Sequence, residues 1–452
     1  MRRTLLFAPI LVGAWLAGCA GLPTDRGAAA VNERLVARGA PAAHFEPAGA
    51  GKLPGAPLTA DQAVALAFER SPAMRAAYAE LGLTGADVIA ARQLPNPTLA
   101  FARLSGEGET QITRSLSLGF ADLLLLPARS KLAGAALESS RDRVAASLQT
   151  LEHDVRAAWI DAVAAGQAAD VAALAARASE TSADYARRLD AAGNLPPRTL
   201  ALEQAAAAEG RIAAARTRAE ALRTRAALAS LVGLSTREGW SLAAKLPMVP
   251  AADPAAGDVD AALTMRLDIA AARRESGALD AAVGVTKAWR WLGDFEVGYE
   301  RETETDGARL RGPTFAWRIP LFNFNRDGLL RAQASSDAAH ARLAALELAA
   351  RNDAALAQDR MATARDIATT YRDALVPQRE AATARTLEEV NYMLTGAFEL
   401  LATRREQFAA YGEYVDAVRD YWLARVDLER ALGARLPGGV ATPELELPGV
   451  MP

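Results

Sequence analysis

The chain has 452 residues, of which 51% are hydrophobic and 23% are charged, and its net charge at pH 7 is −3. This mildly acidic, mixed charge argues against nucleic acid as a partner, because nucleic-acid-binding proteins present a basic patch or stripe. The three histidines are scattered and there is one cysteine, so no cluster has the spacing of metal ligands. We therefore predict no metal site and no cofactor. Without a phosphate-binding loop or a nucleophile constellation, the chain is not expected to be an enzyme.

Residues 1–18 have the pattern of an export signal. Arg2 and Arg3 precede an apolar run, "TLLFAPILVGAWL", that is too short to span a bilayer comfortably. The run leads into "LAGC", which resembles a bacterial lipobox, where the cysteine is acylated and becomes the mature first residue. We therefore predict a signal peptide at 1–18 and a lipid anchor at Cys19, and Ala20 in place of an aspartate favours the outer membrane. An ordinary signal peptide with an incidental cysteine is the alternative.

The chain after the anchor repeats itself at a spacing of about 200 residues. "SLSLGF" matches the position of "FAWRIP", and "ALASLVG" parallels "DLERALG" further along. Several such matches keep the same order, which predicts two repeats at 58–250 and 251–435, joined by a loop rich in proline, alanine and glycine. Residues 19–57 are predicted to be an extended linker, and 436–452 a C-terminal tail.

Each repeat is predicted to contain the same helices in the same order. They are a first helix (59–93 and 258–290), a very long helix (129–191 and 327–394) and, after a turn near glycine, a final helix (198–232 and 397–432). Pro377 should kink or split the second long helix. The last helix has apolar residues at spacings of three and four, which is the pattern of a coiled-coil seam with a polar break at Arg405.

Between the first and second helix of each repeat the pattern changes to a period of two. This predicts β-hairpins at about 97–120 and 293–321, with arms as long as tilted transmembrane strands. A small soluble sheet with one buried face is one interpretation. The other is a share of an outer-membrane β-barrel, in which apolar and polar residues alternate along each strand. Because four strands cannot close, several chains would have to share that barrel: two would give eight strands and three would give twelve.

The order helix, hairpin, long helix, turn, helix, given twice behind a lipobox, resembles the TolC-like outer membrane efflux proteins. "YMLTGAFELLATRRE", "NFNRDGLLRAQA" and "PNP" resemble motifs of that family, and the resemblance covers about residues 58–435. It implies a mainly α fold of long antiparallel coiled-coil helices in two repeats, each with one β-hairpin. Four strands per chain would contribute to a trimeric 12-stranded transmembrane β-barrel that continues into an α-helical periplasmic tunnel.

The resemblance also implies a function: a passive exit duct in the outer membrane that docks to a periplasmic adaptor and an inner-membrane pump. "GAFELL" and "VRDYWLARVDLERALG" most resemble members associated with metal resistance, so copper or divalent cations are the favoured cargo. Drug efflux and protein secretion use the same architecture and stay open. The alternative function is a lipid-anchored coiled-coil spacer or adaptor without a channel.

Within the family, the turns near Gly193 and Gly396 would lie at the periplasmic tip, where acidic residues narrow the tunnel. Glu399 falls on the first acidic position of the motif, whereas the second acid is missing. The candidate gate is therefore Glu399, with Arg404 and Arg405 as residues that could latch neighbouring helices. The other interpretation of Glu399 is a solvated carboxylate at a helix N-terminus, where negative charge is favourable.

Overall fold

The computed structural model describes residues 25, 27–43, 56–106, 108–253, 259–436, 444 and 445. The chain divides into two compact units. The sheet unit contains 1–31, 78–145 and 267–347, and the helical unit contains 32–77, 146–266 and 348–452. The predicted signal peptide at 1–18 and the lipid anchor Cys19 lie outside the described residues, as does most of the tail at 436–452.

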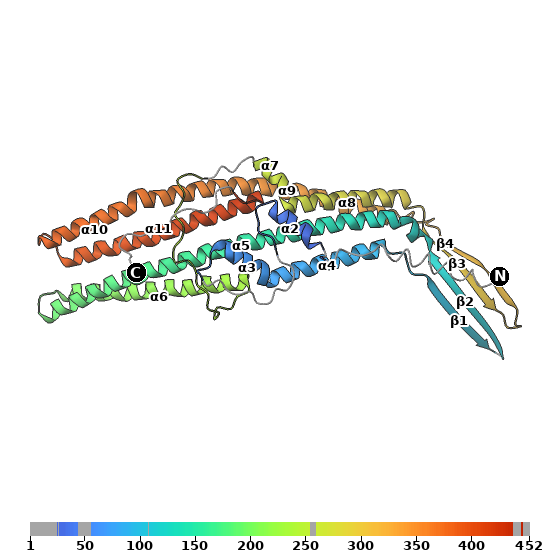
Figure 1. Cartoon of the computed structure of the whole chain (residues 1–452), viewed down its shortest axis with the longest axis horizontal. Helices are drawn as coiled ribbons and strands as arrows, with labels where there is room; N and C mark the ends of the chain where they lie inside the picture. The colour runs from blue at the N-terminus through green and yellow to red at the C-terminus, as the bar shows by residue number, and fades with distance from the viewer. Residues whose placement is uncertain are drawn as a thin grey trace. The chain divides into compact units, whose positions relative to one another are not determined.

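The described elements follow the predicted order twice (Figure 1). The helices are α2 (Ala28–Val36), α3 (Ala60–Arg70), α4 (Pro72–Arg92), α5 (Phe120–Ala191), α6 (Pro197–Val232), α7 (Val259–Met265), α8 (Leu267–Trp289), α9 (Arg326–Thr370), the π-helical turn η2 (Tyr371–Leu375), α10 (Val376–Asn391) and α11 (Ala397–Leu432). The strands are β1 (Thr98–Gly106), β2 (Glu109–Gly119), β3 (Asp294–Thr303) and β4 (Arg309–Arg318). The expected mainly α fold with a small β part is confirmed. No helix in the described part of the chain is both long and apolar enough to cross a membrane.

The first helix of each repeat is broken where the sequence predicted one continuous helix. In the first repeat α3 ends at Ser71, whose backbone is extended (φ −61°, ψ 134°) because the residue before a proline is disfavoured in the helical region. Pro72 then begins α4, where no backbone N–H is needed. The second repeat has the equivalent break between α7 and α8, at Arg266.

Two prolines affect the long helices differently. The predicted split at Pro377 is confirmed: the π-helical turn η2 precedes it, and Pro377 lies in the first turn of α10, where its missing N–H costs little. In the first repeat the helix was predicted to start at residue 129. It starts instead at Phe120 and carries Pro127 in its interior. A proline there removes one backbone hydrogen bond, and the helix continues on both sides of it.

The predicted extended linker 19–57 contains a folded segment, which corrects that expectation. Helix α2 begins after Asp25, whose carboxylate accepts hydrogen bonds from the backbone N–H groups of Gly27 (3.1 Å) and Ala29 (2.9 Å). These bonds also lower the pKa of Asp25. Val31 and Leu35 are fully buried one helical turn apart. The alanine-rich sequence favours a helix, and this apolar pair gives the helix one face to bury.

The last helix of each repeat ends in the same way within the helical unit. Gly233 ends α6 and Gly433 ends α11, both in the left-handed conformation (φ 78° and 69°). A Cβ on Gly233 would lie 2.7 Å from the backbone oxygen of Arg70, and one on Gly433 would lie 2.8 Å from Cγ of Arg266. Arg70 and Arg266 end the first segment of their own repeats, so each final helix packs its C-terminus against the same structural position.

The predicted coiled-coil seam of α11 is part of the buried core of the helical unit. Phe408, Tyr411, Val415, Val418, Trp422 and Val426 are all buried. The polar atoms buried with them are paired: the Tyr411 hydroxyl donates to Glu380 (2.7 Å), and Trp422 Nε1 donates to the Pro247 carbonyl (2.9 Å). Pairing of this kind removes the penalty for burying a polar atom.

Replacing either capping glycine by alanine is expected to destabilise the protein. Gly233→Ala and Gly433→Ala would each place a Cβ at positive φ against neighbouring atoms, at a cost of about 1–3 kcal/mol. The matched control is Gly412→Ala inside α11, where a Cβ meets nothing within 4 Å and should be neutral or stabilise the helix by up to about 1 kcal/mol. Thermal unfolding in mild detergent measures the differences. Equal midpoints for all three variants would contradict the assignment of these glycines as obligatory caps.

Candidate functional site

The two predicted hairpins form one antiparallel sheet in the order β1-β2-β3-β4 (Figure 1). The central pairing joins the repeats: Ile112 on β2 lies opposite Thr303 on β3, and Gly119 lies opposite Glu296. β1 and β4 are the edge strands of this sheet. A row of backbone N–H and C=O groups along each edge is therefore available to another strand.

The register gathers most of the large apolar side chains of the strands on one side, which we call the apolar face. Its apolar members are Leu99, Phe101, Ile112, Leu116, Leu118, Phe295, Val297, Tyr299, Pro313, Phe315 and Trp317. Many are exposed, for example Leu99 at 78%, Phe315 at 65% and Phe101 at 63%. A contiguous exposed apolar surface of this kind indicates contact with a membrane or another protein chain.

The opposite side, the polar face, carries mainly small, hydroxyl and acidic residues, with Leu104 and Leu310 as its large apolar members. On β2 these include Thr113, Ser115 and Ser117, all on the same side of the strand. The charged residues of this face on the described strands are Glu109, Asp294, Glu296, Glu300, Glu302 and Arg318. Arg318 lies 3.9 Å from the carboxylate of Asp294, and Gln111 donates to Glu302. The polar face is therefore predominantly acidic.

Aromatic residues gather where the strands meet the helices of the sheet unit. Trp289, Trp291, Phe322 and Phe324 are exposed there, and Phe322 has no contact that shields it. The rings of Trp291 and Phe324 are 5.0 Å apart, and Trp317 Nε1 donates to the Leu292 carbonyl (2.8 Å). Amphipathic rings concentrated at one end of an apolar face are typical of a membrane–water interface.

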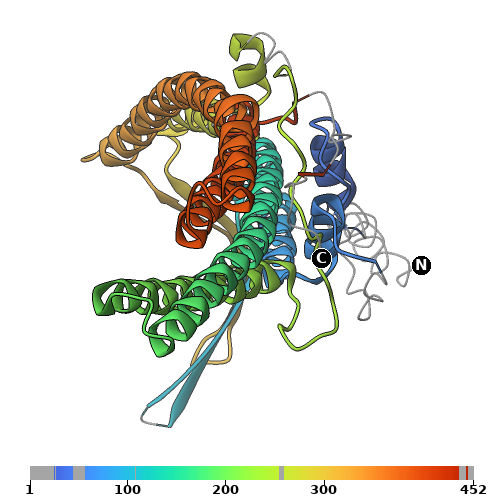
Figure 2. The same ribbon diagram turned by 90° about the vertical axis from the view of Figure 1, so that its left-hand side faces the viewer.

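The predicted turns between the helices form two helical hairpins, α5–α6 and α10–α11, whose turns face the viewer in Figure 2. Gly193 has positive φ (75°), as the first turn requires. In the second turn the left-handed residue is Met393 (φ 58°), whereas Gly396 is extended and caps α11. The backbone before that cap is exposed, with Met393 92% accessible.

The three candidate gate residues have different surroundings. Glu399 is exposed in the first turn of α11. Arg404 donates to Gln407 (3.1 Å) on its own helix and lies over the ring of Phe408 (5.5 Å). Arg405 reaches across to α6, where it donates to Glu203 at 3.4 Å. The structure thus shows an Arg405 contact between two helical hairpins of the same chain, and it does not bring the three residues together.

Glu203 is the partner that sequence reasoning missed. It is buried (9% exposed), and its carboxylate also accepts the Ser182 hydroxyl of α5 at 2.6 Å. The rings of Tyr185 on α5 and Phe398 on α11 lie 5.4 Å apart and form another contact between the two helical hairpins. A signal was present: Glu203 and Arg405 follow Gly193 and Gly396 at almost equal spacing, so aligning the repeats places them at equivalent levels.

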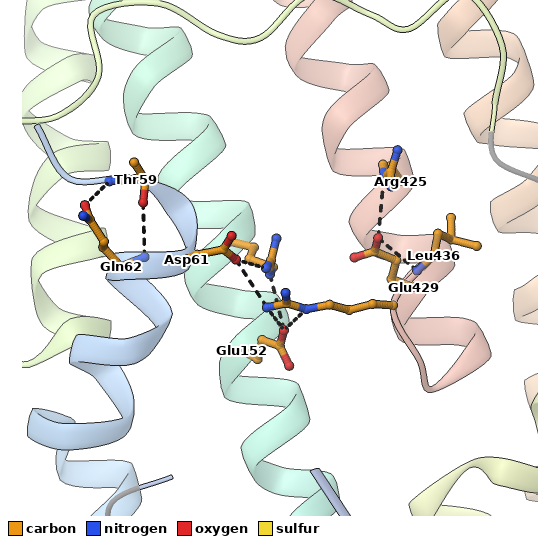
Figure 3. Close-up of polar contacts among 9 residues, drawn as sticks. Thr59, Asp61, Gln62, Glu152, Arg425, Glu429 and Leu436 are labelled. Atoms are coloured by element: carbon orange, nitrogen blue, oxygen red, sulfur yellow. Dashed lines mark hydrogen bonds and ion pairs between the residues drawn. The ribbon is translucent and has the colours of Figure 1, made fainter. Parts of the chain in front are cut away.

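A second polar network connects the two repeats in the helical unit (Figure 3). The buried Glu152 of α5 accepts from Arg435, which follows α11, at 2.6 Å. Arg156 donates to Asp61 of α3, which lies between Thr59 and Gln62 of the capping box. Breaking a buried pair of this kind costs more than breaking a surface pair, because it leaves a charge without a partner.

Glu429 extends this network at the end of α11. It accepts from Arg425 (3.4 Å) and from the backbone N–H of Leu436 (3.3 Å), as Figure 3 shows. Burial raises the pKa of Glu429, and nearby arginines oppose that rise. Several residues of the network line a cavity of about 360 Å³ with Trp159 and Trp422. Because its charges are paired with one another, we assign the network a structural role.

His153 is buried beside the same network. Its Nδ1 has no hydrogen-bond partner within the described residues. Burial, together with Arg430, Arg156 and Arg435, lowers the pKa of His153 to about 3. The side chain is therefore a neutral core residue at ordinary pH and is poorly suited to exchange protons.

The described fold is shared with outer membrane channels of known structure. The chain has the same fold as the Campylobacter jejuni CmeC outer membrane channel (TM-score 0.70, 12% identity, 88% of this chain and 93% of that one). It also matches the open state of the Neisseria gonorrhoeae MtrE outer membrane channel (TM-score 0.70, 19% identity, 83% and 89%). The predicted resemblance to the TolC-like outer membrane efflux proteins is confirmed in the fold.

One characterised protein is also similar in sequence. The cobalt-zinc-cadmium resistance protein CzcC of Cupriavidus metallidurans is 26% identical over 390 residues, which cover 83% of this chain and 90% of CzcC. No model of a known protein family matches the chain.

The contact between Arg405 and Glu203 is expected to contribute modestly to stability. Both side chains are largely shielded (29% and 12% exposed), so a double-mutant cycle with Arg405→Gln and Glu203→Gln should give a coupling of about 0.5–1 kcal/mol. The control cycle uses Arg187 and Asp184, a pair on one helix whose side chains are 62% and 54% exposed. Its coupling should be at most a few tenths of a kcal/mol. Chemical unfolding measures both couplings. A coupling no larger than the control would remove Arg405 as a latch.

His153 should make stability depend on pH. Its folded pKa lies below the unfolded value, so the unfolded chain binds the proton first, and stability present above pH 6.5 is lost as the pH falls toward 3. The full effect is on the order of 4 kcal/mol. His153→Leu should flatten this slope in unfolding measurements across that range. Gln149→Leu, which removes a buried donor to the Gly433 carbonyl (3.0 Å), should lower stability without changing the slope. An unchanged slope in His153→Leu would refute the assignment.

Proposed function

We propose that this chain is the outer-membrane exit duct of a tripartite efflux system, a passive channel and not an enzyme. The observation that carries the proposal is the sheet unit, whose four antiparallel strands have an exposed apolar face and an acidic polar face. An apolar side toward lipid and a polar side toward water is what a membrane strand requires. The shared fold of CmeC and MtrE supports the same conclusion.

The sheet supports assembly as a homotrimer with a twelve-stranded barrel. Backbone groups within lipid must be paired, so the edges of β1 and β4 require strands from other copies. Two copies would give an eight-stranded barrel, whose interior is just wide enough for side chains to fill. Three copies leave room for a water-filled passage. The helical hairpins of the three copies would then form the periplasmic tunnel.

The cargo we propose is a metal cation, because the similar protein CzcC is named a cobalt-zinc-cadmium resistance protein. The polar face supports this, because the carboxylates of Glu296, Glu300 and Glu302 would line the passage of each protomer. Rings of carboxylates favour cations in a water-filled pore. The duct needs no binding site for its cargo, since conduction requires only weak and reversible contacts.

The helical hairpins would dock to a periplasmic adaptor, which in turn would contact an inner-membrane pump. The exposed turn residues Tyr392, Met393 and Leu394 support a protein contact there, because their apolar surface is 78%, 92% and 76% accessible. Glu399 would narrow the passage near these turns. Arg405, held by Glu203, would keep the two hairpins of one chain in register, and Arg404 would stiffen α11.

Acylated Cys19 would be a secondary anchor to the outer membrane. A single acyl chain holds a protein only marginally, and durable anchoring needs more than one membrane-binding signal. Barrel strands from three protomers would hold the protein in the outer membrane without the acyl anchor. A Cys19→Ser protein that is still exported should therefore remain in the outer membrane as a trimer, with lower assembly or sorting efficiency.

The decisive experiment combines that variant with conductance measurements. Purified protein in mild detergent should run as a heat-sensitive trimer and should open water-filled pores in planar bilayers. A lipid-anchored spacer would open none, and its Cys19→Ser form would be released into the periplasm. Release of the variant together with absent conductance would overturn the channel proposal in favour of the spacer.

The acidic polar face predicts cation selectivity that can be reduced locally. Glu300→Gln with Glu302→Gln should shift the reversal potential in a salt gradient toward zero, because two carboxylates leave the passage of each protomer. The matched control removes two exposed carboxylates away from the sheet, Glu33→Gln with Glu80→Gln. An equal shift in the control would mean that net charge, and not the polar face, sets the selectivity.

A further inference from the structure

Five arginines interrupt the apolar face at the end nearest the hairpin turns. Arg114, Arg301 and Arg311 lie in one cross-strand row with Phe101, and Arg103 and Arg309 lie in the next row toward the turns. We call these the arginine rows. Between the arginine rows and the ends of the strands that join the helices, the apolar face contains no charged residue on the described strands.

The arginine rows are unfavourable without an anion. Residues directly opposite on neighbouring strands have Cβ atoms about 4.5–5.5 Å apart, and like charges in that arrangement destabilise a sheet. Within the described residues, no carboxylate lies within ion-pair distance (4.0 Å) of any of the five. The strand carboxylates, including Glu300 and Glu302, project from the opposite face. Among the residues that the structure describes, the arginine rows therefore lack a counter-charge on their own face.

The arginine rows lie at one boundary of the apolar face, and the aromatic residues lie at the other. Phe295 and Arg301 are six residues apart on β3, about 20 Å along the strand. Thr303, level with Arg309, lies about 27 Å from Phe295. The apolar band of an outer-membrane barrel is about 25 Å tall, and strand tilt shortens the projected distances. Long arginine side chains at this level can extend the remaining few ångströms toward the headgroups.

We infer that the arginine rows bind the phosphate groups of anionic lipid headgroups at the outer boundary of the membrane. This inference rests on the proposed function, which places the apolar face against lipid. The guanidinium fork matches phosphate in a bidentate way, and several arginines can share one phosphate-bearing headgroup. Arg114 lies over the ring of Phe101 (5.8 Å to its centroid), which holds its guanidinium beside the apolar surface. Lipid is the occupant because only a lipid presents phosphate at the edge of an acyl-chain layer.

The first test uses the unaltered protein. The assembled trimer is equilibrated with equal amounts of phosphatidylglycerol and phosphatidylcholine and analysed by native mass spectrometry. We expect the trimer to retain at least about ten times more phosphatidylglycerol than phosphatidylcholine. Each arginine near a membrane surface favours anionic lipid, and the contributions of several arginines together correspond to such a factor. Equal retention would overturn the inference without any variant.

The second test removes the central arginine row. In the unaltered protein we expect phosphatidylglycerol, added to phosphatidylcholine vesicles, to raise the melting temperature of the trimer. The triple variant Arg114→Gln, Arg301→Gln and Arg311→Gln should lose both this rise and the preference for phosphatidylglycerol. The matched control replaces three exposed arginines of α9 and α10 by glutamine: Arg331, Arg342 and Arg385. This control variant should keep both the lipid preference and the rise in melting temperature. The corresponding triple lysine variant should keep part of the preference, because charge remains while the bidentate geometry is lost. A preference that persists in the glutamine variant overturns the inference.

Conductance separates failure of this inference from failure of the proposed function. A protein that opens pores equally in both vesicle types and shows no lipid preference is a channel without the proposed lipid site. A protein that opens no pore in either refutes the duct and the lipid site together. Inorganic phosphate added to phosphatidylcholine vesicles should not reproduce the stabilisation; if it does, the arginine rows bind free phosphate and the lipid assignment is wrong.

Discussion

The pairing of β2 with β3 is the constraint on which the sheet unit depends. It brings together two hairpins that lie in different repeats, and it sets the register for all four strands. Because side chains alternate along a strand, a slip of one residue would move every apolar side chain of a hairpin to the opposite side. The apolar face, the polar face and the arginine rows all follow from this one register. Gly298 illustrates how tight it is, since a Cβ there would lie 2.8 Å from the Leu116 carbonyl.

The helical unit is held by contacts between segments distant in sequence. At each glycine cap a residue from a distant segment lies so close that a Cβ would not fit. The polar networks pair side chains from both repeats. Apolar residues along α11 are buried in the core of the helical unit, whereas the buried charges define which segments lie together. The internal repeat explains why the two halves pack alike: Gly233 lies against Arg70, and Gly433 lies against Arg266.

Much of the fold was predictable because its signals are local and periodic. Long helices and two hairpins follow from spacing, and the effect of Pro377 follows from its missing N–H. The breaks at Ser71 and Arg266 were missed because both neighbouring segments favour helix. Helix α2 was missed because it is short and depends on burial of Val31 and Leu35. Of the candidate gate residues, Arg405 contacts Glu203. Aligning the repeats places these two residues at equivalent levels, but only the tertiary structure shows that they pair.

Segregation of charge between the two faces follows from where each charge can be solvated. A carboxylate on the apolar face would lie in hydrocarbon with no long stem to carry it out, whereas arginine can reach a headgroup from within the apolar band. On the polar face, water solvates either sign, and under the proposed function the acidic excess there faces the conducted cations. Arg318 is consistent with this rule: it lies on the polar face at the end of β4, beside Asp294. The sheet therefore places positive charge only where a headgroup, water or a carboxylate can accompany it.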